Sequence, residues 1–221
     1  MDYVKREHEF YENKWGLVFP SWKKEKKPYL KKEAGVEGRR GLELIKNHIS
    51  HGVVLDIGCG GGRNSVLFAK AGFTVFGIDF SEKAVCLAKI NAKEQGVAVT
   101  FGIGDALKLR YDNDYFDAVL DFGLFHHLRK SQYEKYIKNV IRVLKCRGYY
   151  LLYCFSTESE KTSRYESGKR NWALFNGHIY HYFSKEEITK IFSKEFNILN
   201  YELIKEEGRK LAFNLVLLQK K

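Results

Sequence analysis

The sequence lacks the features that would place it in a membrane or outside the cell. No apolar run approaches the ~20 residues of a membrane-spanning helix, and the first residues have no apolar core of the kind that signal peptides contain. The four cysteines form no Cys-x-x-Cys pair and show no metal-site spacing. We therefore expect reduced thiols, no metal, no membrane contact and a cytoplasmic location.

Proline is also scarce, with 2 residues in 221, and no repeat, low-complexity run or interdomain linker is visible. Hydrophobic residues make up 44% and charged residues 29%, which is ordinary for one globular domain. The net charge of +11 permits contact with nucleic acid. However, no dense basic run with interleaved aromatics occurs, and Lys alternates with Glu in residues 23–27. This pattern favours a solvated surface.

What the sequence does contain is a strand, a glycine-rich turn and a helix in succession. Residues 53–57 form an apolar run with the length and β-branched content of a buried strand. The glycine-rich residues 58–62 follow, and residues 64–71 read as a helix closed by Gly72. Such a turn lets a ligand approach the backbone next to the N–H groups of a helix start.

Two aspartates flank this turn and separate two classes of nucleotide cofactor. Asp79 ends a second predicted strand at residues 73–78, where a carboxylate can accept hydrogen bonds from ribose hydroxyls. A dinucleotide site has the pattern Gly-x-Gly-x-x-Gly, but Arg63 stands where the third glycine belongs. Asp56, just before the glycines, would repel a pyrophosphate and suits a cofactor that carries an ammonium and a sulfonium group. That cofactor is S-adenosylmethionine.

The run Asp-x-Gly-x-Gly-Gly-Gly from Asp56 to Gly62 resembles the first motif of the class I S-adenosylmethionine-dependent methyltransferases. Gly-Ile-Asp79-Phe-Ser resembles their second motif. The chain looks most like the small-molecule members (type 11/25), and Arg-Asn-Ser at residues 63–65 is also found in tellurite and thiol methyltransferases. The resemblance covers roughly residues 37–221, whereas residues 1–36 match no family.

This resemblance implies a set of cofactor-binding residues. Asp56 would hold the methionine end of the cofactor, directly or through water, and Asp79 would take both ribose hydroxyls. Phe80 would lie against the adenine, and Asp105 would accept from its amino group. The complete expected set is Asp56, Gly58, Cys59, Gly60, Asn64, Asp79, Phe80, Asp105, Ala106 and Phe122.

Strands alternate with helices along the rest of the chain, which predicts a parallel sheet. The short gap before the last strand predicts an antiparallel pair at the end. We expect an α/β, Rossmann-like, seven-stranded and mostly parallel sheet with the last strand antiparallel and helices on both faces. Further strands are predicted near residues 97–102, 116–121, 149–155, 196–204 and 211–219.

Capping signals predict where several helices begin and end. Ser81 should cap a helix that Gly96 ends. Ser131 with Glu134 and Ser184 with Glu187 form predicted capping boxes. The helix after the first of these boxes has an apolar stripe and should end at Gly148.

The segment after the strand at 116–121 should border the transferred methyl group, because ligands in such sheets lie beyond the carboxyl ends of strands. It has neither the Asn/Asp-Pro-Pro-Tyr of enzymes that methylate base amino groups nor the Cys near a Pro of pyrimidine C5 enzymes. Its Phe-His-His-Leu run resembles small-molecule methyltransferases. His126 or His127 could act as a base if the acceptor arrives protonated, or could cap the next helix or pack beneath the loop.

Two aromatic segments are candidates for closing the active site. Residues 1–36 should contain a helix around residues 3–14 and form a lid, or pack on the side of the domain. Residues 157–181 should be a long irregular insertion over the active site. Period-two spacing places its last residues, His178 and Tyr180, on one face with Tyr182. The expected catalytic set is His126, His127, His178 and Tyr180.

Three functions stay open from the sequence. The first is an S-adenosylmethionine-dependent methyltransferase with a small-molecule acceptor, as a monomer or homodimer. The second is a methyltransferase of RNA or protein, with the Lys-rich N-terminal segment as the docking surface. The third is a non-catalytic S-adenosylmethionine-binding regulatory protein, which the intact Asp56, Asp79 and glycine turn argue against.

Overall fold

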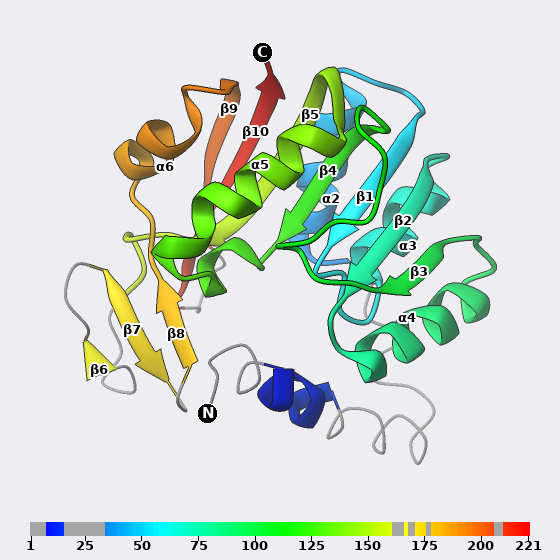
Figure 1. Ribbon diagram of the computed structural model, residues 1–221, viewed down its shortest axis with the longest axis horizontal. Coiled ribbons are helices and arrows are strands. Elements are labelled where there is room, and N and C mark those ends of the chain that lie inside the picture. The colour runs from blue at the N-terminus through cyan, green and yellow to red at the C-terminus, as the bar shows by residue number, and fades with distance from the viewer. Residues whose placement is uncertain (1–7, 16–33, 161–165, 168–170, 176–177, 206–209) are drawn as a thin grey trace. The chain divides into compact units, whose positions relative to one another are not determined.

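The computed structural model describes residues 8–15, 34–160, 166–167, 171–175, 178–205 and 210–221. A seven-stranded sheet has the strand order β3-β2-β1-β4-β5-β10-β9, and β10 runs antiparallel to both β5 and β9 (Figure 1). The predicted fold class is confirmed. The chain divides into two compact units, Met1–Arg110 and Tyr111–Lys221.

The first unit contains parallel strands followed by helices. Its strands are β1 (Val53–Ile57), β2 (Thr74–Asp79) and β3 (Thr100–Ile103), and β2 pairs in parallel with both β1 and β3. Its helices are a helix at residues 8–15, α2 (Val36–Lys46), α3 (Arg63–Lys70) and α4 (Glu82–Glu94). A buried core of Val66, Val85, Ala88, Ala92 and Phe101 joins α3, α4 and β3.

The start of α4 agrees with the prediction from the sequence. The Ser81 hydroxyl oxygen accepts the N–H of Ala84 at 3.2 Å, and the acidic Glu82 occupies the first turn. Gly96, just past the end of this helix, has a φ of 67°, which glycine adopts without steric cost. The end of β2 and the start of α4 are therefore fixed by local sequence.

The second unit combines the rest of the main sheet with a small separate sheet (Figure 1). Its main strands are β4 (Phe116–Phe122), β5 (Leu144–Phe155), β9 (Phe196–Lys205) and β10 (Ala212–Lys220). Its helices are η1 (Phe125–His127), η2 (Lys130–Gln132), α5 (Tyr133–Val143) and α6 (Lys185–Phe192). No helix in the described ranges is long and apolar enough to cross a bilayer.

The insertion at residues 157–181 is more regular than predicted. Its described part forms an antiparallel sheet of β6 (Glu166–Ser167), β7 (Trp172–Phe175) and β8 (His178–His181). Alternation over four residues or fewer is too short to predict such strands from one sequence.

The predicted helix end at Gly148 is wrong. The helix ends at Val143 and β5 begins at Leu144, four residues before this glycine. The pairing of β4 with β5 shifts register between Phe116 and Ala118. Arg147 has a φ of 59°, so the glycine belongs to an irregularity within the strand rather than to a helix cap.

The predicted capping box of Ser131 and Glu134 is also wrong. Ser131 lies inside the 3-10 turn η2, and the helix begins after Gln132 with no side-chain cap. The side-chain oxygen of Gln132 instead accepts the N–H of Arg129 at 2.8 Å. Because Ser131 is already within a helical turn, it lacks the extended backbone that an N-cap residue needs.

Candidate functional site

The glycine-rich turn after β1 uses its backbone N–H groups internally. Gly58 and Cys59 donate to the carbonyl oxygen of Ile78 at 2.8 and 2.9 Å, and Gly60 donates to Oδ2 of Asp79 at 2.9 Å. A pyrophosphate site would need such N–H groups to point at the ligand. These three N–H groups therefore stabilise the turn itself and do not point at a ligand.

Asp79 is held at the end of β2 with both carboxylate oxygens in defined positions. Oδ2 accepts the N–H of Gly60 and Oδ1 accepts the N–H of Ser81, each at 2.9 Å. Burial raises the pKa of Asp79, and these two hydrogen bonds oppose the increase. Its side chain keeps 6% exposure. Each oxygen retains a lone pair, so the carboxylate can accept two further donors, as a ribose diol requires.

Asp56 lies beneath the turn and is bound to the next helix. Its Oδ2 accepts the hydroxyl of Ser65 at 2.5 Å, and it is only 1% exposed. Asn64, by contrast, lies against α2: a Cβ at Gly38 would come within 2.3 Å of its Oδ1. Ser65, in the first turn of α3, is thus a hydrogen-bond partner of Asp56.

Cys59 and Asn91 also hold the turn in place, through contacts with the core and with α4. The side chain of Cys59 packs on the apolar core of the first unit, where burial raises its pKa well above the usual value. Asn91 of α4 donates from Nδ2 to the carbonyl oxygen of Gly61 at 3.0 Å. The sequence analysis missed Asn91, although a polar residue on the buried face of α4, beside Ala88 and Ala92, was an available signal.

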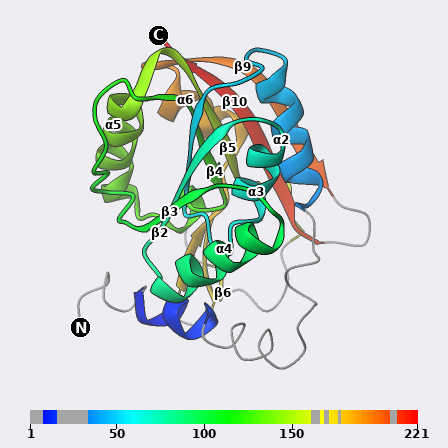
Figure 2. The ribbon, with the colours of Figure 1, turned by 90° about the vertical axis from the view of Figure 1, so that its right-hand side faces the viewer.

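The helix at residues 8–15 packs beside the turn and the start of α4 (Figures 1 and 2). A Cβ at Gly60 would lie 2.8 Å from a ring atom of Trp15, so only glycine leaves room for this indole. The rings of His8 and Tyr11 lie 5.6 and 5.4 Å from that of Phe80. This helix therefore contacts two residues of the expected cofactor set.

Charged groups reinforce this packing. Oε2 of Glu12 lies 3.6 Å from Nζ of Lys83, which also donates to the Glu12 carbonyl oxygen at 3.3 Å. Burial acts to raise the pKa of Glu12, but Ser81, Glu82 and Lys83 at the start of α4 lower it overall. Burial lowers the pKa of Lys14, against the attraction of Asp79.

The remaining expected cofactor residues are dispersed. Asp105 is exposed and its Oδ1 accepts the N–H of Leu107 at 2.8 Å, while Ala106 is buried. Phe122 belongs to the second unit, where it ends β4 with its ring 6.3 Å from that of Tyr153.

In the second unit, η1 brings both expected histidines against aromatic rings. His126 stacks on Phe155 with centroids 4.0 Å apart, and its Nδ1 accepts the Phe155 N–H at 3.4 Å. An accepting ring nitrogen carries no proton, so this contact assigns the proton to Nε2 of a neutral imidazole. The ring of His127 lies 4.8 Å from that of Tyr180. His178 is buried at the start of β8, where it pairs with Phe175 of β7.

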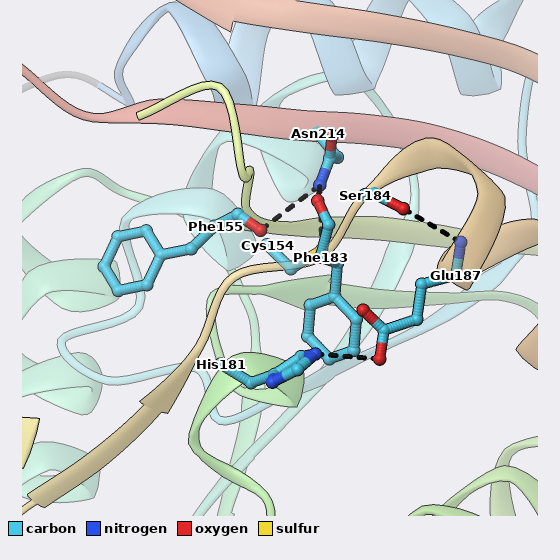
Figure 3. Close-up of polar contacts among 7 residues, drawn as sticks. All are labelled: Cys154, Phe155, His181, Phe183, Ser184, Glu187 and Asn214. Carbon is cyan, nitrogen blue, oxygen red and sulfur yellow. Dashed lines mark hydrogen bonds and ion pairs between the residues drawn. The ribbon is translucent and has the colours of Figure 1, made fainter. Parts of the chain in front are cut away.

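A buried pair that the sequence analysis did not predict joins β8 to α6 (Figure 3). Nε2 of His181 lies 2.9 Å from Oε1 of Glu187, and His181 is 3% exposed. Burial lowers the pKa of His181, and Glu187 opposes this effect. The second predicted capping box is half correct, because the Ser184 hydroxyl oxygen accepts the Glu187 N–H at 3.2 Å while the Glu187 carboxylate contacts His181.

Asn214 of β10 links the same region to β5 (Figure 3). Its Nδ2 donates to the carbonyl oxygens of Phe155 and Phe183 at 3.2 and 3.0 Å, and the residue is fully buried. The backbone beyond β8 is thus held to the carboxyl end of β5. Within the described part of the chain, no group of three His, Cys, Asp or Glu side chains could hold a metal ion.

Comparison with known proteins agrees with this geometry. A family model described as a methyltransferase domain matches residues 54–148. An uncharacterized methyltransferase of Schizosaccharomyces pombe is 31% identical over 133 residues, which cover 60% of this chain and 92% of that protein. The chain belongs to the methyltransferase family.

Solved structures place this methyltransferase among the S-adenosylmethionine-dependent ones. Such an enzyme from Methanosarcina mazei is 25% identical with a TM-score of 0.71, over 80% of this chain and 96% of that one. The 1,6-didemethyltoxoflavin-N1-methyltransferase of Burkholderia thailandensis, solved with 1,6-didemethyltoxoflavin and S-adenosylhomocysteine, shares the fold at 19% identity. Its TM-score is 0.72, over 97% of this chain and 90% of that one.

The cofactor of the methyltransferase is S-adenosylmethionine, and the first unit fits it. Three N–H groups of the turn are used internally, Asp79 has lone pairs left for ribose hydroxyls, and Asp56 supplies a carboxylate beneath the turn. These features favour a ligand with a diol and cationic groups over one with a pyrophosphate.

Proposed function

We propose that this methyltransferase acts on a small acceptor molecule that contacts aromatic side chains of the second unit. The observation that carries the proposal is the ring cluster of His126, His127, Phe155 and Tyr180 beyond the carboxyl ends of β4 and β5. Their neighbouring centroids lie between 4.0 and 6.4 Å apart. Tyr180 and Phe155 are only half-buried, so their rings can take part in contacts to a planar molecule.

The bound cofactor supplies an electrophilic methyl group on a good leaving group. The residues of this chain bind, align and desolvate the reactants. Asp79 takes the ribose and Asp56 holds the methionine end. The Nδ1 of His126 is engaged by the backbone N–H of Phe155, so His126 would align the acceptor through ring contacts and not as a base at that nitrogen. His127 is then the better candidate for a base, together with the hydroxyl of Tyr180.

We also propose that residues 1–36 form a lid, of which the structure describes the helix at 8–15. Trp15 lies on Gly60, and Tyr11 and His8 contact Phe80. A segment in this position shields the cofactor from water. The other expected lid residues of this segment, such as Trp22, lie outside the described residues, as does Tyr165 in the insertion.

The fold neighbour from Burkholderia thailandensis supports a small acceptor, because that enzyme was solved with the heteroaromatic molecule that it methylates. The sequence carries the same expectation independently, since the segment after β4 lacks the motifs of base methyltransferases. A salt-resistant reaction would distinguish such an acceptor from RNA, whose binding weakens steeply with salt.

The test is methyl transfer from radiolabelled S-adenosylmethionine to a panel of phenols, thiols and nitrogen heteroaromatics, beside total RNA and mixed proteins. We expect label in one or more small molecules, at rates that change little from about 50 to about 200 mM salt. Asp79→Ala is the control for cofactor dependence. Label that enters RNA or protein instead would replace the proposal, and S-adenosylhomocysteine binding without any transfer would favour the regulatory alternative.

A further inference from the structure

Asp121 lies near the end of β4, is fully buried and is surrounded by hydrogen-bond donors. Its Oδ1 accepts the backbone N–H groups of Gly123, Leu124 and Phe125 at 3.2, 2.7 and 3.2 Å. Gly123 and Leu124 lead into η1, and Phe125 is the first residue of η1. One carboxylate oxygen therefore holds the whole turn that precedes His126 and His127.

The other oxygen of Asp121 is bound by two tyrosines from different elements. The hydroxyl of Tyr136, on α5, donates to Oδ2 at 2.6 Å, and that of Tyr150, on β5, lies 3.3 Å from the same atom. The two hydroxyls are also 3.3 Å from each other. The carboxylate thus fixes the loop relative to both α5 and β5.

This arrangement suits an ionised carboxylate better than a protonated one. An ionised carboxylate only accepts hydrogen bonds, and every described partner of Asp121 is a donor. Burial raises the pKa of Asp121 to about 6, against the effect of Tyr136 and the loop N–H groups. Its negative charge also contributes to the raised pKa values of Tyr150 and Cys154, for which burial is the larger cause.

The loop that Asp121 holds has little freedom elsewhere. Gly123 has a φ of 104°, and a Cβ there would lie 3.4 Å from Cε1 of His126. Phe125 is fully buried, with its ring 5.1 Å from that of Phe183 and 4.7 Å from that of Tyr133. His126 and His127 follow Phe125 directly in the sequence. A change at Asp121 would therefore reach them through the backbone of this loop, whose other residues are held by packing.

We propose that Asp121 is a positioning residue for methyl transfer, whose buried carboxylate holds loop 123–127 so that His126 and His127 face the acceptor. The inference rests on the proposed function to the extent that these histidines contact the acceptor. Asp121 itself is fully buried, so it would act through the loop and not by touching the reactants. Asp79 offers a contrast, because that carboxylate also ends a strand but keeps exposed surface for a ligand.

The decisive variant is Asp121→Asn, which keeps the shape and one accepting oxygen but removes the charge. Its amide group would face the two tyrosine hydroxyls, which can rotate to accept. The matched control is Asp117→Asn on the same strand, where Oδ1 lies 2.8 Å from Nζ of Lys145 and the side chain is 27% exposed.

Two readouts test the proposal. Hydrogen exchange of residues 122–128, with S-adenosylhomocysteine bound, should be several-fold faster in Asp121→Asn than in the wild type and unchanged in Asp117→Asn. The fastest acceptor of the small-molecule panel should show kcat lowered by about 10- to 100-fold in Asp121→Asn with KM little changed. Because the pKa of Asp121 is raised to about 6, we expect the wild-type kcat to fall as the pH drops through that value, and Asp121→Asn should lack this acid limb.

Unchanged exchange of the loop in Asp121→Asn, or a wild-type kcat and acid limb, would overturn the positioning role. A loss of affinity for S-adenosylhomocysteine equal to the loss of kcat would also overturn it, because the substitution would then disturb cofactor binding and turnover alike. If no panel compound is methylated by the wild type, the proposed function fails while the exchange experiment still decides whether Asp121 holds the loop.

Discussion

Asp79 and Asp121 show how differently the two units use the same kind of residue. Each is an aspartate at the end of a buried parallel strand, and each accepts backbone N–H groups from the turn that follows. Asp79 keeps 6% exposure and free lone pairs, whereas Asp121 has 0% exposure and donors on both oxygens. The first can bind a ligand, and the second can only fix the protein around one.

The surroundings of the two aspartates extend this difference. In the first unit, glycines and backbone N–H groups that are already hydrogen-bonded surround Asp79 and Asp56. The backbone of the turn therefore determines the shape of this site. In the second unit the site is built from rings, because His126, His127 and Tyr180 pack against aromatic neighbours. Under the proposed function, the cofactor would bind aspartates that the turn holds in place, and the acceptor would contact aromatic side chains, which can vary without disturbing the turn.

The largest expected effect concerns the stability of Asp121→Asn. The hydrogen-bond donors around Asp121 suit its ionised form, but burial has the larger effect and raises its pKa to about 6, so the folded state holds the proton more tightly than the unfolded state does. Its contribution to stability is therefore present at low pH and lost as the pH rises through about 6. At neutral pH the ionised group costs about 3 kcal/mol, so Asp121→Asn should raise the free energy of unfolding there and have little effect near pH 4. Urea unfolding measures this, and destabilisation at neutral pH would remove the contrast with Asp79.

Asp79→Ala should instead lower ligand affinity and leave the fold intact. We expect S-adenosylhomocysteine affinity, measured by calorimetry, to fall by about 1–3 kcal/mol through loss of charge-assisted hydrogen bonds, while the fold is retained. Asp105→Ala, at an exposed position, should have a smaller effect. If the melting temperature collapses while affinity stays unchanged, Asp79 is an internal anchor like Asp121.

His181 is a second buried titrating group of the second unit, beside Asp121. Burial lowers the pKa of His181, so the neutral form is favoured in the folded protein. Its contribution to stability is present above the usual pKa of 6.5 and is lost as the pH falls below that value. The wild type should therefore lose more stability between about pH 7.5 and pH 5.5 than His181→Gln, which does not titrate. Equal losses in urea unfolding would show that burial does not favour the neutral form of His181, for example because the contact with Glu187 offsets it.

The smallest effect is expected at the contact between the N-terminal helix and α4. Glu12→Gln removes a negative charge from the start of α4, which is worth about 0.3–1 kcal/mol. Affinity for S-adenosylhomocysteine should fall only about two- to five-fold, with no change for Glu9→Gln on the exposed side of the same helix. A stronger loss would mean that the helix contributes directly to cofactor binding.

The fold and the first motif could be predicted from the sequence because their signals are local. The strand, glycine turn and Asp79 lie within 27 residues (53–79), and Ser81 caps the helix that immediately follows. The helix boundaries predicted from Ser131 and Gly148 were wrong because a 3-10 turn and a strand irregularity use the same residue types as helix caps. Trp15 on Gly60, Tyr136 on Asp121 and His181 with Glu187 are contacts set by tertiary packing, which spacing alone does not encode.

The position of the Trp15 indole has a practical consequence for optical measurements. Of the three tryptophans in the chain, Trp15 lies on Gly60 in the first unit and Trp172 lies 4.3 Å from the His181 ring in the second. Trp22 lies outside the described residues. The emission of Trp15 should respond to ligands at the glycine turn, and that of Trp172 to protonation of its imidazole neighbour. With Trp22 replaced by Phe, and either Trp15 or Trp172 replaced by Phe in turn, the one remaining tryptophan reports on its own half of the chain without any added label.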